Sequence, residues 1–325
     1  MFWCCMSTRV ILLGGPTASG KSRLARALAR QLDGVVVNAD SMQVYRELRI
    51  LTARPSAIEE AEVPHRLYGV LPAAEVCSAA RWRSLALGEL DSARKSGKAA
   101  ILVGGSGLYF RALIRGLAPV PPVPDAVRRL ARSRHAELGN EAFFAELAER
   151  DSEMASRLTV GDRQRVIRAW EVFESTGVSL AEWQRRSSVP FDGRHLALVL
   201  APERESLYEA CNRRFREMVA AGAVREVSAL LSLCLDSDLP AMKALGVRPL
   251  TRHLKGEINL ESAILHGMRE TRHYAKRQLT WFHHQMPEAT VIDVPYSKSM
   301  ESRIMDMAQQ FLLTGEERKS SFQHL

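Results

Sequence analysis

The sequence predicts an α/β protein: a P-loop parallel sheet core with helices on both faces, and an inserted all-helical domain. Short apolar runs alternate with helical stretches, which is the pattern of a parallel sheet covered by helices. Two of these runs end in paired glycines, Gly14-Gly15 and Gly104-Gly105. After the second pair, a proline-rich segment leads into a charged helical stretch without a strand pattern, which indicates an insertion.

The predicted strands are short runs of aliphatic residues. The first, at 10–13, is followed by a helix at 22–32 whose apolar residues recur on one face. Further strands are predicted at 35–37, 101–103 and 196–200, with a candidate fifth at 291–294. A long helix is predicted from residue 261 to about residue 284.

The segment PVPPVP at 119–124 can continue neither a helix nor a central strand, so it marks a boundary. We therefore expect the first part of the core at 1–118, a helical insertion at 119–190 and the second part of the core, with C-terminal helices, at 191–314. The polar tail at 315–325 is expected to be disordered.

Charge and composition limit the function. The net charge of +8, from 45 Lys and Arg against 37 Asp and Glu, suits a polyanionic partner such as nucleic acid; the alternative is a basic enzyme without one. Five scattered cysteines lack metal-ligand spacing and argue against a disulfide framework, so we expect a cytoplasmic protein. No apolar run reaches about 18 residues, and we expect no membrane span.

A phosphate-binding motif follows the first strand. Residues 15–22, GPTASGKS, fit G-x-x-x-x-G-K-[ST], in which backbone N–H groups cradle phosphate. Lys21 adds a charge and the Ser22 hydroxyl can ligate Mg²⁺. By motif alone an NTP such as ATP is the default ligand, and a glycine turn without function is the alternative. The predicted phosphate-binding residues are Gly15, Pro16, Thr17, Ala18, Ser19, Gly20, Lys21 and Ser22.

Asp40 follows the second strand, and ligands of open α/β sheets bind beyond the carboxyl ends of strands. Its position leaves three roles open: a Mg²⁺ ligand, a general base, or the cap of a following helix. The turn after the third strand, with Ser106, can offer N–H groups and a hydroxyl to an anion. Its alternative is a tight turn that needs positive φ, with Ser106 as N-cap and with Tyr109 and Phe110 in the core.

Basic runs recur along the chain. Gln164 and Arg168 share a helix face, and Arg and Gln suit base edges and phosphates. Each run taken singly favours a solvated face, but three in one chain favour a nucleic-acid footprint. The runs are Arg163, Arg165 and Arg168; Arg128, Arg129, Arg132 and Arg134; and Arg269, Arg272, Lys276 and Arg277.

Several segments, in order, resemble the bacterial tRNA dimethylallyltransferase family. Besides the P-loop, which many families share, they include DSMQVY (40–45), VGGSGLYFRAL (103–113), DRQRVIRAWEVFESTG (162–177), ALGVRPL (244–250) and AKRQLTWF (275–282). Two departures, Leu51 before TARPS and Gly246-Val247-Arg248-Pro249, affect only local geometry.

The resemblance implies a donor and an acceptor. The P-loop would hold dimethylallyl diphosphate rather than ATP, with Mg²⁺ near Ser22 and with Arg248 near the diphosphate. Asp40 would be the general base for the exocyclic amine of the adenosine 3′-adjacent to the anticodon, in tRNAs reading codons that begin with U. Lys21 and Ser106 would complete the catalytic set, Ser106 lying beside the acceptor.

The resemblance also implies tRNA contacts, to the anticodon stem-loop, and we expect a monomer. The implied contact residues are Asp40, Ser41, Met42, Gln43, Ser106, Arg128, Gln164, Arg165, Val166, Ile167 and Arg168. Two rival activities are an adenylate isopentenyltransferase that uses a free nucleotide and a P-loop small-molecule kinase.

Overall fold

The computed structural model describes residues 8–186, 188–294 and 296–314; the predicted disordered tail lies outside them. The chain divides into two compact units. One comprises residues up to Ile114 together with those from Asp192 onward, and the other is Arg115–Phe191. The sequence boundaries at 119 and 190 fall within four residues of this division.

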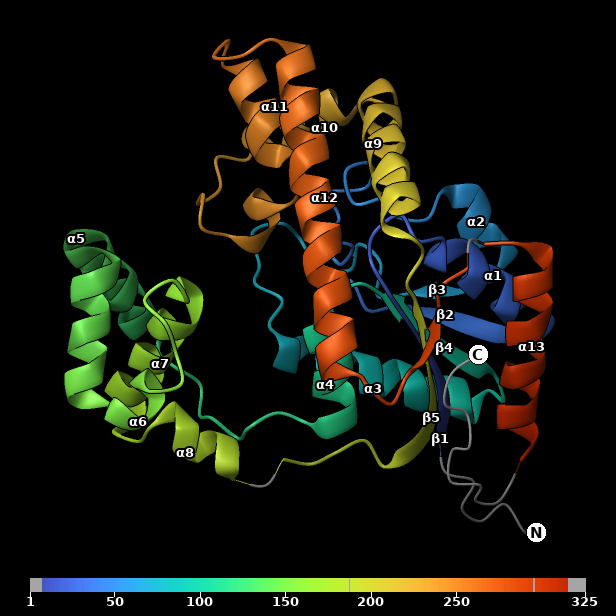
Figure 1. The fold of residues 1–325 in the computed structure, drawn as a ribbon, viewed down its shortest axis with the longest axis horizontal. Helices are drawn as coiled ribbons and strands as arrows, with labels where there is room; N and C mark the ends of the chain where they lie inside the picture. The colour runs from blue at the N-terminus through green and yellow to red at the C-terminus, as the bar shows by residue number, and fades with distance from the viewer. Residues whose placement is uncertain (1–7, 187, 295, 315–325) are drawn as a thin grey trace. The chain divides into compact units, whose positions relative to one another are not determined.

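The first unit is built on a six-stranded sheet in the order β3-β2-β4-β1-β5-β6, with every pairing parallel (Figure 1). The predicted fold class is confirmed. The two-residue β3 was not predicted, because a segment this short shows no periodicity, and the last strand ends two residues earlier than expected. The strands are β1 Thr8–Gly14, β2 Gly34–Asn38, β3 His65–Arg66, β4 Ala99–Gly104, β5 Gly193–Leu200 and β6 Thr290–Ile292.

Helices cover both faces of this sheet (Figure 1). On one face, Leu28 of α1 and Ile304 of α13 pack with Ile11 and Leu198 in a continuous buried cluster. On the other face α3 packs against β1, β2 and β4 with Trp82 fully buried. The helices of this unit are α1 Lys21–Gln31, α2 Ala57–Glu62, α3 Ala79–Lys95, α4 Gly107–Arg115, α9 Arg204–Ala220, α10 Ala223–Leu231, α11 Val247–Leu254, α12 Leu260–Gln285 and α13 Lys298–Leu313, with a 3-10 turn at Pro240–Lys243.

The register of the central strands brings three predicted segments to one edge. Gly14 of β1 pairs with Gly104 of β4, and Asn38 of β2 pairs with Val103. Parallel strands end at the same edge of a sheet, so the P-loop, the Asp40 segment and the Ser106 turn leave it side by side.

The long helix α12 lies against this edge through glycines. A Cβ added to Gly14 would lie 2.6 Å from the Phe282 ring, and one on Gly105 would lie 2.0 Å from Gln278 Nε2. A Cβ on Gly107 would lie 2.0 Å from the Trp281 ring. The absence of these side chains is what lets α12 approach both turns.

The turn after β4 differs from the tight turn considered above. Gly104, Gly105 and Gly107 all lack positive φ, so their role is close approach rather than left-handed backbone. Tyr109 stacks on Trp82 with ring centroids 4.3 Å apart, and Phe110 is fully buried, which confirms both as core residues.

The second unit is helical in its described residues, as predicted. Its core packs Phe143 and Leu147 of the first helix against Val166 and Trp170, and a non-helical Gly139 kinks that first helix. The helices are α5 Asp125–Arg150, α6 Ser152–Ala155, α7 Arg163–Thr176 and α8 Leu180–Arg185. Over the part of the chain that the structure describes, every helix is too short or too polar to cross a bilayer.

Gly104→Ala should lower the melting temperature by about 5–10 °C, because the new Cβ would lie 2.0 Å from the Ala39 carbonyl oxygen. Gly88→Ala is the matched control. Gly88 lies within α3 with open space around it, so alanine should raise the melting temperature by about 2–4 °C. Equal melting temperatures for the two variants in thermal denaturation would contradict this packing.

Candidate active site

The P-loop connects β1 to α1 and its backbone conformation requires glycine at two positions. Gly15 has φ 140° and a Cβ there would lie 2.5 Å from the Leu200 carbonyl oxygen, while Gly20 has φ 90° at the N-cap of α1. The Lys21 ammonium donates to the Pro16 carbonyl. The loop therefore curls over the lysine, and the N-terminus of α1 points its free N–H groups at the same place.

Lys21 lies in a poorly solvated position. Burial is the largest effect and lowers the pKa of its ammonium to about 7, while the negative charge of Asp40 acts in the opposite direction. Arg214 lowers the pKa further. An anion bound here would favour the protonated lysine, so anion binding and protonation are linked.

Arg214 of α9 is a site residue that the sequence analysis missed. Its guanidinium donates to the Thr17 hydroxyl, and burial lowers its pKa against the raising effects of Cys211 and Asp40. The buried stripe of α9 is formed by Leu207, Cys211, Phe215 and Met218. The sequence signal that could have indicated this role is an arginine at the border of a buried apolar stripe.

Asp40 is held by its own backbone and by a buried amide. Its N–H donates to Asn38 Oδ1 at 2.8 Å, and Asn38 Nδ2 donates to the carbonyls of Asp40 and Leu67, each at 3.0 Å. Asp40 Oδ1 accepts the Met42 N–H at 2.9 Å. The carboxylate thus caps a turn, not a helix as one alternative had it, since the next helix begins at residue 57 with Ser56 as its cap.

The Ser106 turn is bonded to the residue that follows Asp40. The Ser106 hydroxyl accepts the Ser41 N–H at 2.8 Å and lies 3.1 Å from the Ser41 hydroxyl. The pKa of the Tyr274 phenol is raised first by burial and then by the charge of Asp40. The same two causes raise the pKa of Tyr68. Both phenols are therefore neutral at physiological pH.

Gln278 of α12 joins the two glycine turns. Its Oε1 accepts the Thr17 N–H at 2.8 Å, and its Nε2 donates to the Gly105 carbonyl at 2.8 Å. The side chain is 5% exposed. One amide therefore sets the distance between the P-loop and the Ser106 turn.

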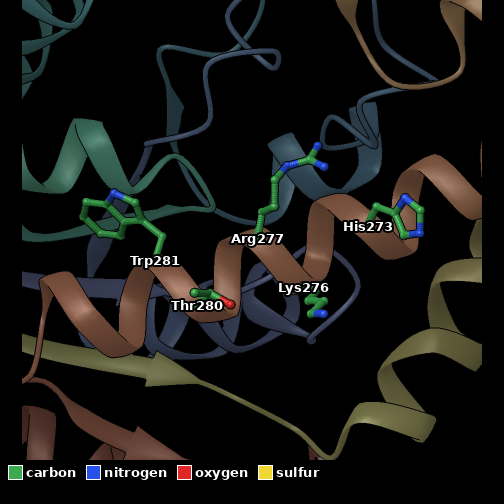
Figure 2. Close-up of a pocket in the computed structure, with 5 residues that line it drawn as sticks. All are labelled: His273, Lys276, Arg277, Thr280 and Trp281. Atoms are coloured by element: carbon green, nitrogen blue, oxygen red, sulfur yellow. The ribbon is translucent and has the colours of Figure 1, made fainter. Parts of the chain in front are cut away.

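A pocket of about 490 Å³ lies on one face of α12. Its lining is cationic and aromatic, and the spacing of three and four residues puts all its members on one side of the helix (Figure 2). Such a surface suits phosphates and flat bases. The lining residues are His273, Lys276, Arg277, Thr280 and Trp281.

Comparison with known proteins shows which family the chain resembles. A sequence profile described as IPP transferase matches residues 43–285. The chain is 54% identical over 286 residues to a tRNA dimethylallyltransferase from Rhodospirillum centenum, covering 87% of this chain and 91% of that protein. It is 50% identical over 311 residues to a protein of the same name from Paramagnetospirillum magneticum, covering 95% and 98%.

The chain belongs to the IPP transferase family. A crystal structure of a full-length tRNA isopentenylpyrophosphate transferase from Bacillus halodurans is 30% identical, with a TM-score of 0.69, and covers 94% of this chain and 97% of that one. A eukaryotic dimethylallyltransferase crystallised in action on tRNA matches with a TM-score of 0.81 at 23% identity, which extends the fold to a distant relative.

The family match contains Ser106, Arg214 and Gln278, whereas the P-loop and Asp40 precede it. The structure brings Lys21, Asp40 and Ser106 to one edge of the sheet in this IPP transferase.

Other predicted residues have narrower roles. Gln43 donates through Nε2 to the carbonyls of Thr52 and Ala53, at 2.8 and 3.2 Å, and so fixes its own loop. Arg248 is exposed on α11, where its charge lowers the pKa of Glu270 against the larger raising effect of burial. Between Arg248 and the P-loop the described residues show no hydrogen bond or ion pair, so its diphosphate contact stays a prediction.

The predicted tRNA-contact residues of the helical unit divide into exposed and buried ones. Arg165 has a 65% exposed side chain, with Asp162 3.8 Å away, and Gln164 is exposed beside it. Val166 is 2% exposed and belongs to the core, so its side chain is not available for tRNA, and Ile167 packs against the same core. Two other arginines are ion-paired: Arg168 with Glu171 at 3.2 Å and Arg128 with Asp125 at 3.8 Å.

Lys21→Met should raise the melting temperature by a few degrees in phosphate-free buffer at pH 6–7. The folded-state pKa of about 7 lies below the unfolded value of about 10.4, so the unfolded chain binds the extra proton between these values. Stability of the unmodified protein therefore rises with pH across this window, and the advantage of the variant should shrink by pH 9.

Lys255→Met is the control, because Lys255 is exposed at the end of α11. Differential scanning calorimetry from pH 6 to pH 9 measures both variants. If the melting-temperature advantage of Lys21→Met stays constant or grows with pH, the lowered pKa of Lys21 is refuted.

Proposed function

We propose that the protein transfers a dimethylallyl group from dimethylallyl diphosphate to the exocyclic amine of the adenosine 3′-adjacent to the anticodon, in tRNAs reading codons that begin with U. The observation that carries this is the electrostatic neighbourhood of Asp40. Its charge acts on Lys21, Arg214 and Tyr274, so a base and an anion-binding cluster share one site. The names of the bacterial relatives support the same reaction.

Departure of the diphosphate is the first requirement of this reaction. Lys21, Arg214 and the N-terminus of α1 supply positive charge where negative charge grows on the leaving oxygen. Preorganised charge of this kind costs no rearrangement as the reaction proceeds.

The site also suits Mg²⁺. Mg²⁺ takes one or two protein oxygens together with phosphate oxygens and waters, and among the described residues no cluster of three His, Cys, Asp or Glu side chains exists. Ser22, exposed at the start of α1, and the donor's phosphates would hold it. When bound, the ion would neutralise charge on the leaving diphosphate.

The acceptor nitrogen needs a base, because its lone pair is delocalised into the adenine ring. As the new carbon–nitrogen bond forms, the carbon–oxygen bond to the diphosphate breaks and the nitrogen loses a proton to Asp40. The Met42 N–H holds Oδ1, which leaves Oδ2 to take that proton. Ser106 lies beside Asp40 and can position the acceptor.

Binding of tRNA is assigned to cationic surfaces in both units. In the helical unit these are Gln164, Arg165, Arg168 and Arg128, and in the sheet unit the pocket on α12. We expect a cytoplasmic monomer, the compartment because tRNA is the substrate.

The deciding experiment is incubation with labelled dimethylallyl diphosphate and unmodified tRNA, followed by nucleoside analysis. Label in a prenylated adenosine beside the anticodon supports the proposal. Label in AMP but not in tRNA would indicate a free-nucleotide enzyme, and phosphoryl transfer from ATP would indicate a kinase.

Asp40→Asn should lower turnover by about 10²–10⁴-fold, the usual contribution of a general base. The asparagine keeps an oxygen for the Met42 N–H, so the local fold and the affinity for tRNA should change by less than about twofold. Single-turnover kinetics and filter binding measure the two quantities. Asp91→Asn is the control, because the Asp91 side chain on α3 is 46% exposed and pairs only with neighbouring cations of its own helix. Turnover of the Asp40 variant within about threefold of the unmodified enzyme would exclude the base assignment.

Arg165→Ala should weaken tRNA binding and reduce the slope of log K against log salt by about one, as expected for one lost phosphate contact. Arg157→Ala is the matched control in the same unit, because Arg157 is ion-paired with Glu153 at 2.7 Å. Filter binding between about 50 and 200 mM salt gives the slopes. The same slope for both variants would mean that Arg165 does not touch phosphate.

A further inference from the structure

The first half of the P-loop is short of N–H donors. Phosphate loops bind their ligand through backbone N–H groups. Pro16 has none, and the N–H of Thr17 already donates to Gln278 at 2.8 Å. Of the four variable positions in the motif, only Ala18 and Ser19 keep an N–H without a partner among the described residues.

Gln278 is not free to release the Thr17 N–H. Its side chain is 5% exposed and its Nε2 donates to the Gly105 carbonyl at 2.8 Å. Turning the amide over would set its oxygen against that carbonyl and its nitrogen against the Thr17 N–H. Both hydrogen bonds would be lost inside the protein, which is costly.

A second helix covers the same part of the loop. Arg214 donates to the Thr17 hydroxyl, and the buried Cys211 thiol lies 3.9 Å from the Thr17 carbonyl. Side chains of α9 and α12 therefore occupy all three polar groups of Thr17. The donors that remain are those from Ala18 to the first turn of α1.

We propose that Gln278 is a specificity-determining residue that limits the P-loop to a chain of two phosphates and so discriminates against triphosphates. A third phosphate would bring further charged oxygens to the loop, and the Thr17 N–H is not free to receive them. Gln278 acts through Thr17 and is therefore a positioning residue. The inference rests on the proposed function, in which the loop holds a diphosphate.

Inorganic pyrophosphate and inorganic tripolyphosphate test this inference, because they carry no organic group and differ only in the number of phosphates. Their dissociation constants, measured by titration calorimetry with Mg²⁺, give a ratio for each variant. Gln278→Met fills the same space but frees the Thr17 N–H, so it should shift the ratio toward tripolyphosphate by about tenfold, the value of one charge-assisted hydrogen bond. Gln278→Leu, with a different shape, should shift it in the same direction.

Gln285→Met is the matched control, because it makes the same substitution at the last residue of α12 and should leave tripolyphosphate disfavoured. A loss of stability alone would weaken both ligands together and leave the ratio unchanged. If the ratio of the two dissociation constants in both Gln278→Met and Gln278→Leu stays within about twofold of that of the unmodified protein, this inference is overturned and the proposed function is not. The proposed donor site would be overturned as well if the unmodified protein did not bind pyrophosphate, or if Lys21→Met bound it equally well.

Discussion

The site depends on one buried amide, that of Gln278. Its two hydrogen bonds fasten α12 to the P-loop and to the turn after β4, at 2.8 Å each. These bonds are possible only because Gly105 and Gly107 have no side chains, since a Cβ on either would lie 2.0 Å from an α12 side chain. The GGPTASGKS, VGGSGL and AKRQLTWF segments, far apart in sequence, are thus one interlocking structure.

The sheet supplies the remaining constraint. Its parallel register ends β1, β2 and β4 at a common edge. The strand register therefore brings the phosphate loop, the Asp40 carboxylate and the Ser106 hydroxyl to the same edge. Asn38 and the Met42 N–H then fix the Asp40 segment and its carboxylate, while burial raises the pKa of Tyr274 and Tyr68 and keeps these phenols neutral. The positive charge of the site is concentrated at Lys21 and Arg214.

Local patterns in the sequence predicted the major elements, because the continuous apolar runs of β1, β2, β4 and β5 and the charged, strand-free insertion each give a clear local signal. β3 could not be predicted, since its two residues show none. Arg214 and Gln278 were missed for a different reason: they act through contacts with Thr17, which lies 197 and 261 positions away. Val166 was predicted to contact tRNA but is buried. The family motif covers consecutive residues of one helix and does not tell the exposed side chains from the buried ones.

The order of the strands also affects how the chain is made. β1 pairs on one side with β4, which ends at Gly104, and on the other with β5, which ends at Leu200. At translation rates of about 5–20 residues per second, one edge of this apolar central strand waits about 5–20 s for its partner while the helical unit is synthesised. An exposed edge strand invites pairing with other chains. Until β5 has been made, that edge of the nascent sheet is therefore open to aggregation and to binding by chaperones.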